Sequence, residues 1–335
     1  MAHWIPDIIS AVDVFTIGIV IIKAINLITI YTLPSRLSRY AHTSSSGDAP
    51  WALVTGASDG IGQALAHELA IQGFNVVLHG RNHTKLSAAL SRLRAKHPEQ
   101  SFRLLIADAS TVPCMNCIGS GQISTTTADS SQIPPDFEAI QADLSDLNLT
   151  MLINNAGGGA VNPICLPLSE SSATRITGNI SLNALFPLHL TRVLLPILRR
   201  NAPALVMNIS SMADQGFPLL ASYSASKQFL MNMTRAVGLE SRLDDGDKTV
   251  ELLGVRIGRV TDVSHCKEPP SLFTPDSQTM ARAALARSGH GNGIVVGYWA
   301  HALQQLGTNL LPTWAQDRVF MDVMRQERER ELRTR

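Results

Sequence analysis

The stretch 51–70 constrains most strongly what this chain can fold into. It opens with the apolar run Trp51–Val54, which is typical of a buried parallel strand. The loop TGASDGIG follows at 55–62, and the next residues have apolar side chains at helical spacing. A glycine loop between a strand and a helix lets the backbone approach a phosphate at the helix N-terminus. The pattern therefore predicts a dinucleotide-binding unit. The expected contacts come from Gly56, Ser58, Gly60, Ile61 and Gly62.

The end of the next predicted strand, Asn75–His79, indicates which dinucleotide binds. A free ribose 2′-hydroxyl is usually bound by an acidic residue about 20 positions after the glycines. Here the strand runs into Gly80-Arg81-Asn82, with no acid, and an arginine at this position can bind a 2′-phosphate. Arg81 therefore favours NADP over NAD as the cofactor. The alternative is that Arg81 is a solvated charge in a loop.

A third predicted strand begins at Phe102 and ends in Asp108, a carboxylate that could reach the adenine of the cofactor. Residues 109–136 are rich in Ser, Thr, Pro and Gly, which indicates an irregular surface loop. This loop contains Cys114-Met115-Asn116-Cys117, but no second cysteine pair lies at a suitable spacing, so no metal site is predicted. The chain then returns to a helical pattern and to a strand, 149–153, that ends in Asn154-Asn155-Ala156-Gly157.

Tyr223 and Lys227 stand four residues apart in the segment 223–227. On a helix, residues with this spacing share a face, with Cβ atoms roughly 5–6 Å apart. A nearby ammonium stabilises a phenolate, so we expect Lys227 to lower the pKa of Tyr223. Such a pair could pass a proton to or from an alcohol oxygen. The alternative is a chance pair on a helix surface.

These motifs occur in one order along the chain: the glycine loop, Asp108, the segment 154–157 and the Tyr223/Lys227 pair. The combination resembles the short-chain dehydrogenase/reductase family over about residues 51–263. The resemblance implies an α/β fold in a single domain, a Rossmann-type doubly wound parallel sheet with its active site at the carboxyl ends of the strands. It also implies that Asn155 and Gly157 line the cofactor.

The resemblance further implies a set of catalytic residues. In that family Tyr223 would be the acid or base, and Lys227 would tune it and bind the nicotinamide ribose. Ser211 would donate a hydrogen bond to the substrate oxygen, and Asn183 would hold a water that connects Lys227 to solvent. Two alternatives remain open. Ser210 matches the family spacing to the tyrosine better than Ser211 does, and Asn179 lies one turn before Asn183.

The sequence departs from the family after the predicted strand that ends at Arg256. A Pro-Gly pair is typical there, but this chain has Ile257-Gly258. The resemblance still implies contacts from Val260 and Thr261 to the nicotinamide amide.

The N-terminus has the composition of a membrane anchor. Val14–Leu33 is long enough to cross a bilayer and contains one charge, Lys23, and the basic residues Arg36 and Arg39 follow it. We therefore expect an anchor in residues 1–42, a linker in 43–50, and a domain that folds without either. The flanking charge predicts that the catalytic domain faces the cytosol. The expected location is the endoplasmic reticulum membrane. An interfacial helix and a soluble helix packed on the domain are the alternatives.

The remaining segments bear on the substrate. The catalytic domain is expected over 51–315, with 264–315 shaping the substrate side, and the charged tail 316–335 has no assigned function. The chain has 28 basic and 27 acidic residues, which gives no electrostatic reason to expect nucleic acid binding.

The predicted function is an NADP(H)-dependent oxidoreductase that interconverts a ketone and a secondary alcohol. The N-terminal apolar stretch and the C-terminal segment together resemble the membrane-associated branch of the family, which includes 17β-hydroxysteroid dehydrogenases and 3-ketoacyl-CoA reductases. This resemblance implies a lipophilic substrate of the steroid, triterpenoid, polyketide or long-chain acyl type. It also implies a biosynthetic step. Partners would be this substrate and membrane lipid, and a homo-oligomer is compatible with the sequence. An inactive, cofactor-binding scaffold or sensor is the alternative of another class.

Overall fold

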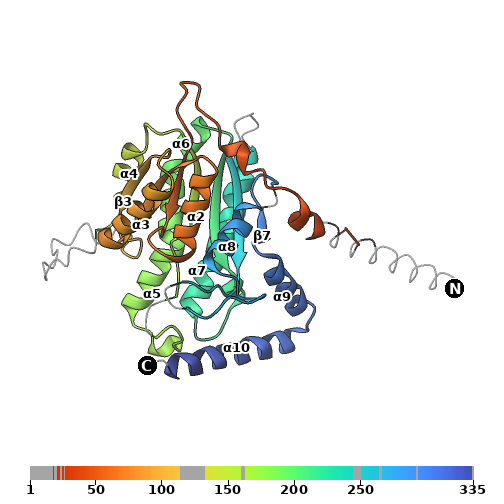
Figure 1. The fold of residues 1–335 in the computed structure, drawn as a ribbon. Coiled ribbons are helices and arrows are strands. Elements are labelled where there is room, and N and C mark those ends of the chain that lie inside the picture. Colours follow the sequence, from red (N-terminus) through yellow and green to blue (C-terminus); the bar gives the residue numbers. More distant parts are fainter. Residues whose placement is uncertain are drawn as a thin grey trace, which may run out of the picture.

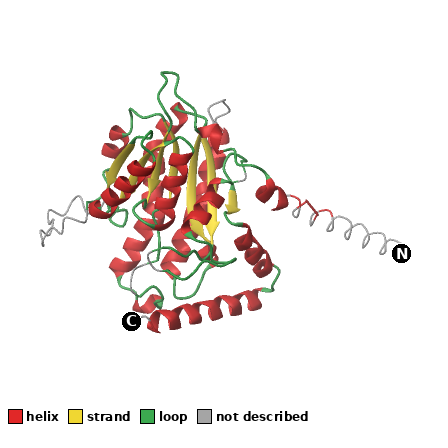
Figure 2. Cartoon of the chain, viewed as in Figure 1, coloured by secondary structure: helices red, strands yellow, loops and turns green. Residues whose placement is uncertain are grey.

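The computed structural model describes residues 18, 21–22, 25, 27–113, 133–159, 163–243, 250–263, 266–291 and 293–333. Over these residues the chain forms one seven-stranded sheet, in which all pairs of neighbouring strands are parallel. Helices cover both of its faces (Figure 1 and Figure 2). The predicted single-domain, doubly wound parallel sheet is therefore confirmed.

The strand order is β3-β2-β1-β4-β5-β6-β7, so the order reverses between β1 and β4. In open α/β sheets a ligand binds outside the carboxyl ends of the strands at this reversal. The strands are β1 (Trp51–Thr55), β2 (Asn75–Gly80), β3 (Phe102–Ile106), β4 (Leu149–Asn154), β5 (Ala204–Ser211), β6 (Val250–Ile257) and β7 (Ile294–Val296).

The helices alternate with the strands, as expected for parallel crossovers. They are α2 (Gly60–Ile71), α3 (His83–Lys96), α4 (Phe137–Asp143), α5 (Ala173–Ile180), α6 (Phe186–Arg200), α7 (Ala221–Leu243), α8 (Ser277–Leu285), α9 (Trp299–Asn309) and α10 (Thr313–Arg333). A π-helical turn, η4 (Ser181–Leu185), joins α5 to α6, and three short 3₁₀ turns are η1 (Leu37–Tyr40), η3 (Leu168–Glu170) and η5 (Met212–Gln215).

The core lies on both faces of the sheet, because alternate residues of each strand point to opposite faces. In β1, Ala52 and Val54 belong to the cluster that packs under α2, α3 and α8, whereas Leu53 belongs to the cluster under α4 and α6. Every residue of β1 is buried. A strand that is apolar along its whole length is what a sheet covered on both faces requires.

Residues just before β1 are part of the folded domain. Leu37 and Tyr40 of η1 are buried in the core, and the Tyr40 carbonyl accepts a 2.7 Å hydrogen bond from Thr150 Oγ1. The Asn148 side chain donates to the carbonyls of His42 and Asp48 at 2.9 and 3.1 Å. The packed unit therefore includes residues upstream of Trp51, and Asn148, directly before β4, holds the segment 42–48 by two hydrogen bonds.

Most of the predicted anchor, including residues 1–17, lies outside the described residues. The described part, 27–32, is helical. Among described residues, one helical stretch is long and apolar enough to cross a bilayer, Ala173–Arg200, and 56% of its most apolar window is buried. This stretch is α5, η4 and α6, whose apolar side chains pack against the sheet, so its composition reflects a core position.

The C-terminal helix α10 crosses the molecule near the carboxyl ends of the strands (Figure 1). The Phe320 ring stacks on Phe217 with 4.4 Å between ring centroids. Near its end, the Glu331 carboxylate accepts hydrogen bonds from the backbone N–H groups of Ile164 (2.6 Å) and Cys165 (3.1 Å). The sequence gives this charged segment no function, yet the structure ties it to two loops that flank Tyr223.

Candidate active site

The glycine loop joins β1 to α2 in the predicted manner. Asp59 caps the helix by accepting a 2.7 Å hydrogen bond from the Gly60 N–H. The first-turn amides of Ile61 and Gly62 have no earlier helical carbonyl to which they can donate. A Cβ atom at Gly62 would lie 2.1 Å from the Gly56 carbonyl oxygen, so only glycine allows this turn to close. Ser58 lies between these glycines, beside Gly80 at the end of β2.

The segment that follows β4 supports this loop. Thr55 Oγ1 accepts hydrogen bonds from the backbone N–H groups of Asn155 and Ala156 at 2.9 and 2.8 Å. The Asn155 side chain donates to the Thr55 carbonyl at 2.9 Å. The structure thus brings Asn155 against the end of β1, at the point where the strand order reverses.

Arg81 follows β2, and its side chain is 60% exposed. One guanidinium nitrogen lies 3.8 Å from Asp108 Oδ2, and the other oxygen of Asp108 accepts hydrogen bonds from the N–H (2.9 Å) and hydroxyl (2.7 Å) of Ser110. Asp108 therefore holds its own turn together and faces Arg81. Most of the Arg81 guanidinium remains free to bind an anion.

Tyr223 and Lys227 lie on one face of α7, and Lys227 Nζ is 5.9 Å from the centroid of the Tyr223 ring. Lys227 is buried and donates a 2.8 Å hydrogen bond to the Ile209 carbonyl of β5. Burial lowers the pKa of Lys227 to about 8, and the carboxylate of Asp214 acts in the opposite direction.

Burial raises the pKa of Tyr223 above its ordinary value. A hydrogen bond with the Ser211 side chain lowers this pKa, and the Asp214 charge raises it further. The net direction is set by desolvation of the phenolate, which outweighs the hydrogen bond with Ser211. The phenol therefore keeps its proton at neutral pH.

Gly157 brings Lys227 and Asn183 to the same place. A Cβ atom there would lie 2.7 Å from Lys227 Nζ and 2.8 Å from Asn183 Oδ1. Asn183 is fully buried in the π-helical turn η4, where its Nδ2 donates to the carbonyls of Gly158 (3.0 Å) and Asn179 (2.9 Å). Its Oδ1 accepts from the Gly158 N–H at 3.0 Å, which leaves one lone pair for a water.

Asn179, the alternative to Asn183, is also buried and donates a 3.0 Å hydrogen bond to the Gly158 carbonyl. It contacts the same turn from one helical turn away. Because the Asn183 oxygen lies beside the site occupied by Lys227 Nζ, the geometry favours Asn183 as the residue that works with Lys227.

The two candidate serines end β5 with opposite orientations, as successive residues of a strand must. Ser210 is 1% exposed and its hydroxyl donates to the Lys227 carbonyl at 3.2 Å. Ser211 is half-buried and hydrogen-bonded to Tyr223, and its Oγ also accepts from the Ala213 N–H at 3.1 Å. This arrangement favours Ser211 as the serine that faces a substrate.

The segment after β6 is held by internal contacts. The Gly258 N–H donates a 3.0 Å hydrogen bond to Nδ1 of His301, a buried residue of α9. Val260 is buried, and the Thr261 hydroxyl donates to the Glu268 carbonyl while its N–H donates to the Pro275 carbonyl at 2.9 Å. The structure thus places Val260 and Thr261 within a packed loop and directs the Thr261 hydroxyl to the backbone.

The sequence analysis missed Asp214 and Arg256. The Asp214 carboxylate is completely buried in η5, and its Oδ2 accepts a 2.6 Å hydrogen bond from Arg256 Nε on β6. Its Oδ1 has no partner among the described residues. No local motif marks these residues, but the pairing of Ser210 with Arg256 in the β5–β6 register would have placed Arg256 beside the candidate serines.

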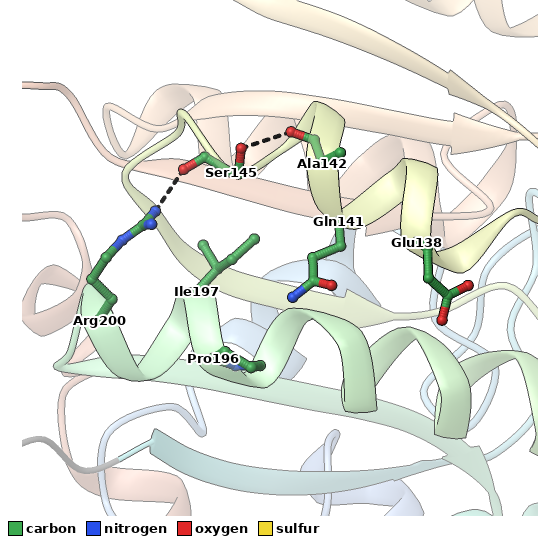
Figure 3. A pocket seen from close by; sticks show the side chains of 7 residues that line it. All are labelled: Glu138, Gln141, Ala142, Ser145, Pro196, Ile197 and Arg200. Carbon is green, nitrogen blue, oxygen red and sulfur yellow. Dashed lines mark hydrogen bonds between the residues drawn. The ribbon is translucent and has the colours of Figure 1, made fainter.

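A small hollow opens beside Tyr223. Its wall combines aliphatic side chains with the polar side chains of Ser171, Arg175, Asn179 and Ser222, and it comes from the loop after β4, from η3, from α5 and from the loop before α7. The lining residues include Ile164, Leu166, Leu168, Leu219, Leu220 and Tyr223. A second hollow lies between α4 and α6, where Arg200 Nη2 donates to the Ser145 carbonyl at 2.7 Å (Figure 3). This second hollow contains none of the predicted site residues.

Comparisons with known proteins show the family of this chain. The family model for short chain dehydrogenases matches residues 50–115 and 121–260. The very-long-chain 3-oxoacyl-CoA reductase of Emericella nidulans is 27% identical over 284 residues, which cover 83% of this chain and 73% of the relative. The corresponding reductase of Caenorhabditis briggsae is 27% identical over 276 residues, covering 82% and 79%.

Solved structures show the same fold. A 7β-hydroxysteroid dehydrogenase superposes with a TM-score of 0.63 at 19% identity, covering 82% of this chain and 96% of that one. A short-chain dehydrogenase from Sphingobium yanoikuyae in complex with NADPH gives a TM-score of 0.58 at 20% identity, covering 79% and 97%. The family match, the fold and the cluster around Tyr223 lead to one conclusion: the chain belongs to the short-chain dehydrogenase family and is an oxidoreductase of the kind that interconverts C–OH and C=O groups.

Proposed function

We propose that this chain uses NADPH to reduce the ketone of a long-chain 3-oxoacyl substrate to a secondary alcohol, in a biosynthetic step at the endoplasmic reticulum membrane. The observation that carries the proposal is the hollow beside Tyr223. The aliphatic side chains of Ile164, Leu166, Leu219 and Leu220 form one part of its lining, and Arg175 and Asn179 add polar groups. Aliphatic side chains next to a proton donor suit a carbonyl on an alkyl chain. The relatives named as very-long-chain 3-oxoacyl-CoA reductases support the acyl class over the steroid class.

The residues around the glycine loop fit a phosphorylated dinucleotide. Ile61 and Gly62 offer first-turn amides, and the largely exposed Arg81 offers its guanidinium to a 2′-phosphate. Lys227 and Asn155 would hold the ribose side of the same molecule. When bound, the reduced nicotinamide supplies the hydride that the carbonyl carbon receives.

Side chains of this chain would supply the proton that the carbonyl oxygen receives. The raised pKa of Tyr223 keeps its O–H available, so Tyr223 donates that proton to the carbonyl oxygen as it becomes an alcohol. The Ser211 hydroxyl donates a hydrogen bond to the same oxygen, where negative charge develops. Lys227 stabilises the resulting phenolate, and a water held at the free lone pair of Asn183 returns a proton from solvent. The net direction that this electrostatic setting favours is reduction.

The membrane part of the proposal is supported by the exposed aliphatic residues at the N-terminus. Ile21, Ile22, Ile25 and Ile28 are all more than half exposed. An apolar sequence of this length, followed by Arg36 and Arg39, is suited to a bilayer with the catalytic domain on the cytosolic side.

A substrate panel tests the proposal. The full-length protein in detergent is given NADPH and, in turn, 3-oxohexadecanoyl-CoA, a steroid ketone and a small water-soluble ketone, and loss of NADPH absorbance is followed. We expect the acyl substrate to have the highest kcat/KM. Turnover of the steroid with none of the acyl substrate would reject the acyl assignment and leave the reductase assignment standing.

A further inference from the structure

The region between α9 and α10 presents a large apolar surface to solvent. Trp299, Leu303, Leu306 and Leu310 follow the spacing of one helix face. The first three side chains are 44–47% exposed, and Leu310, directly after α9, is 78% exposed. Trp314, at the start of α10, is 75% exposed. We call residues 299–316 the α9–α10 elbow.

The elbow also lacks charge. No Asp, Glu, Lys or Arg stands between Arg287 and Asp317, whereas α10 beyond Asp317 carries a charged residue in every turn. The polar residues of the elbow are neutral, and its one histidine, His301, is fully buried. An exposed helix with leucines on one face and tryptophans at both ends has the composition of a segment that lies in a membrane interface. A water-facing helix of a soluble domain would carry charges on this face.

The elbow begins beside the place where the N-terminal helix leaves the domain. The Tyr31 hydroxyl donates a 2.6 Å hydrogen bond to the carbonyl of Val296, three residues before Trp299. The Arg287 guanidinium lies 4.9 Å from the Tyr31 ring and donates to the Ile30 carbonyl. The described part of the N-terminal helix extends from the side of the domain on which α9 lies (Figure 1).

We propose that the α9–α10 elbow inserts its leucine and tryptophan side chains into the surface of a lipid bilayer, as a second membrane contact next to the N-terminal helix. The uncharged surface matches the acyl region of a bilayer, and the tryptophans match its interface. The proposal rests on the membrane association in the proposed function, but it concerns different residues.

The contact would orient the active site. From the elbow, α10 leads to the loops that border the hollow beside Tyr223, through Phe320 on Phe217 and through Glu331 on Ile164. The contact would thus hold the loops that border the hollow at a fixed distance from the bilayer surface.

Tryptophan quenching in vesicles tests the inference. The full-length protein is reconstituted in phosphatidylcholine vesicles with plain or brominated acyl chains, together with the double variant Trp299→Phe/Trp314→Phe. The fluorescence difference between wild type and variant isolates the two elbow residues from Trp4 and Trp51. We expect brominated chains to reduce this difference roughly twofold or more, because the indoles lie at the acyl boundary. An equal difference in both lipids would overturn the proposal.

A matched pair of charge insertions provides the second arm. Leu306→Glu/Leu310→Glu changes the elbow, and Leu239→Glu/Leu243→Glu makes the same change at the end of α7, where the two leucines are 52% and 79% exposed. We expect only the elbow variant to raise KM for the membrane-dissolved substrate, by about tenfold. Both variants should reduce the water-soluble ketone with NADPH like the wild type. A wild type that reduces none of the substrates with NADPH would reject the proposed function. A wild type that is active but shows no quenching by brominated lipid would reject only the membrane contact of the elbow.

A second copy of the chain is the competing occupant. Sedimentation in detergent distinguishes this alternative. If the elbow joins two copies, the wild type should sediment as a dimer and Leu306→Glu/Leu310→Glu as a monomer. That result would overturn the proposal, whereas an unchanged association state supports it.

Discussion

Arg256 Nε donates a 2.6 Å hydrogen bond to Asp214 Oδ2, and this ion pair lies next to the Tyr223/Lys227 pair. The Asp214 carboxylate is buried, so its charge is poorly screened. It raises the pKa of both Tyr223 and Lys227. Asp214 thus helps the two groups to keep their protons, although it contacts neither the substrate hollow nor the glycine loop.

This relationship predicts a pH effect. Reduction requires Tyr223 as the phenol and Lys227 as the ammonium, so kcat/KM should fall as the pH rises through the Lys227 pKa of about 8. Asp214→Asn removes a charge that raises both pKa values, so the alkaline limb of the pH profile should move to lower pH. The control is Asp146→Asn, which breaks an exposed pair with Arg103 and should leave the profile unchanged. A profile that moves to higher pH in Asp214→Asn would contradict the account.

Substitution of the two serines of β5 should affect different properties, catalysis for Ser211 and stability for Ser210. Ser211→Ala removes the hydroxyl that faces the substrate oxygen, and we expect kcat to fall by about 10²-fold or more. Ser210→Ala removes a buried hydrogen bond to the Lys227 carbonyl and should mainly lower the free energy of unfolding, by about 1 kcal/mol. Steady-state kinetics and urea unfolding of both variants separate these effects. A larger kcat loss in Ser210→Ala would reverse the assignment.

Cofactor preference should depend on Arg81. Arg81→Asp removes the guanidinium proposed to bind the 2′-phosphate and should weaken NADPH binding by about 1.5–3 kcal/mol, as expected for a charge-assisted hydrogen bond. NADH, which lacks this phosphate, should lose less. The dissociation constants of both cofactors, measured by fluorescence, check the prediction. Equal affinities for NADPH and NADH in the wild type would contradict it.

Two truncations of the N-terminal segment should have different effects. Removal of residues 1–26 should weaken membrane binding, because only the α9–α10 elbow then remains as a contact, and should preserve the fold. Removal of residues 1–44 also deletes Leu37 and Tyr40 from the core and should lower the free energy of unfolding by about 3 kcal/mol or more. Membrane sedimentation and thermal unfolding of both truncations test this division. An equally stable protein after both deletions would show that η1 is dispensable.

Local patterns explain what the sequence could predict. The glycine loop, the segment 154–157 and the Tyr223/Lys227 spacing each lie within one turn or loop, so their chemistry is visible without the fold. Asp214 and Arg256 are 42 residues apart, and Glu331 is 167 residues from Ile164. Such contacts depend on strand order and helix packing, which no single segment encodes.

The pKa of Tyr223 likewise could not be predicted from the sequence. The neighbouring Lys227 is visible in the sequence, but the burial that raises the Tyr223 pKa is not. Burial of Leu37 and Tyr40 cannot be seen in the sequence for a similar reason. The polar residues 43–48 resemble a linker, and only the fold shows that Asn148 binds the carbonyls of His42 and Asp48 on either side of them.

The central claim is that Tyr223 delivers the proton in an NADPH-dependent reduction. The most direct measurement is the single-turnover rate of Tyr223→Phe with 3-oxohexadecanoyl-CoA, taken together with its dissociation constant for NADPH. The account predicts a rate loss of about 10²–10⁴-fold, the range for a lost general acid, with NADPH binding nearly unchanged. A rate within about threefold of wild type would contradict it, since that is far less than general acid catalysis contributes.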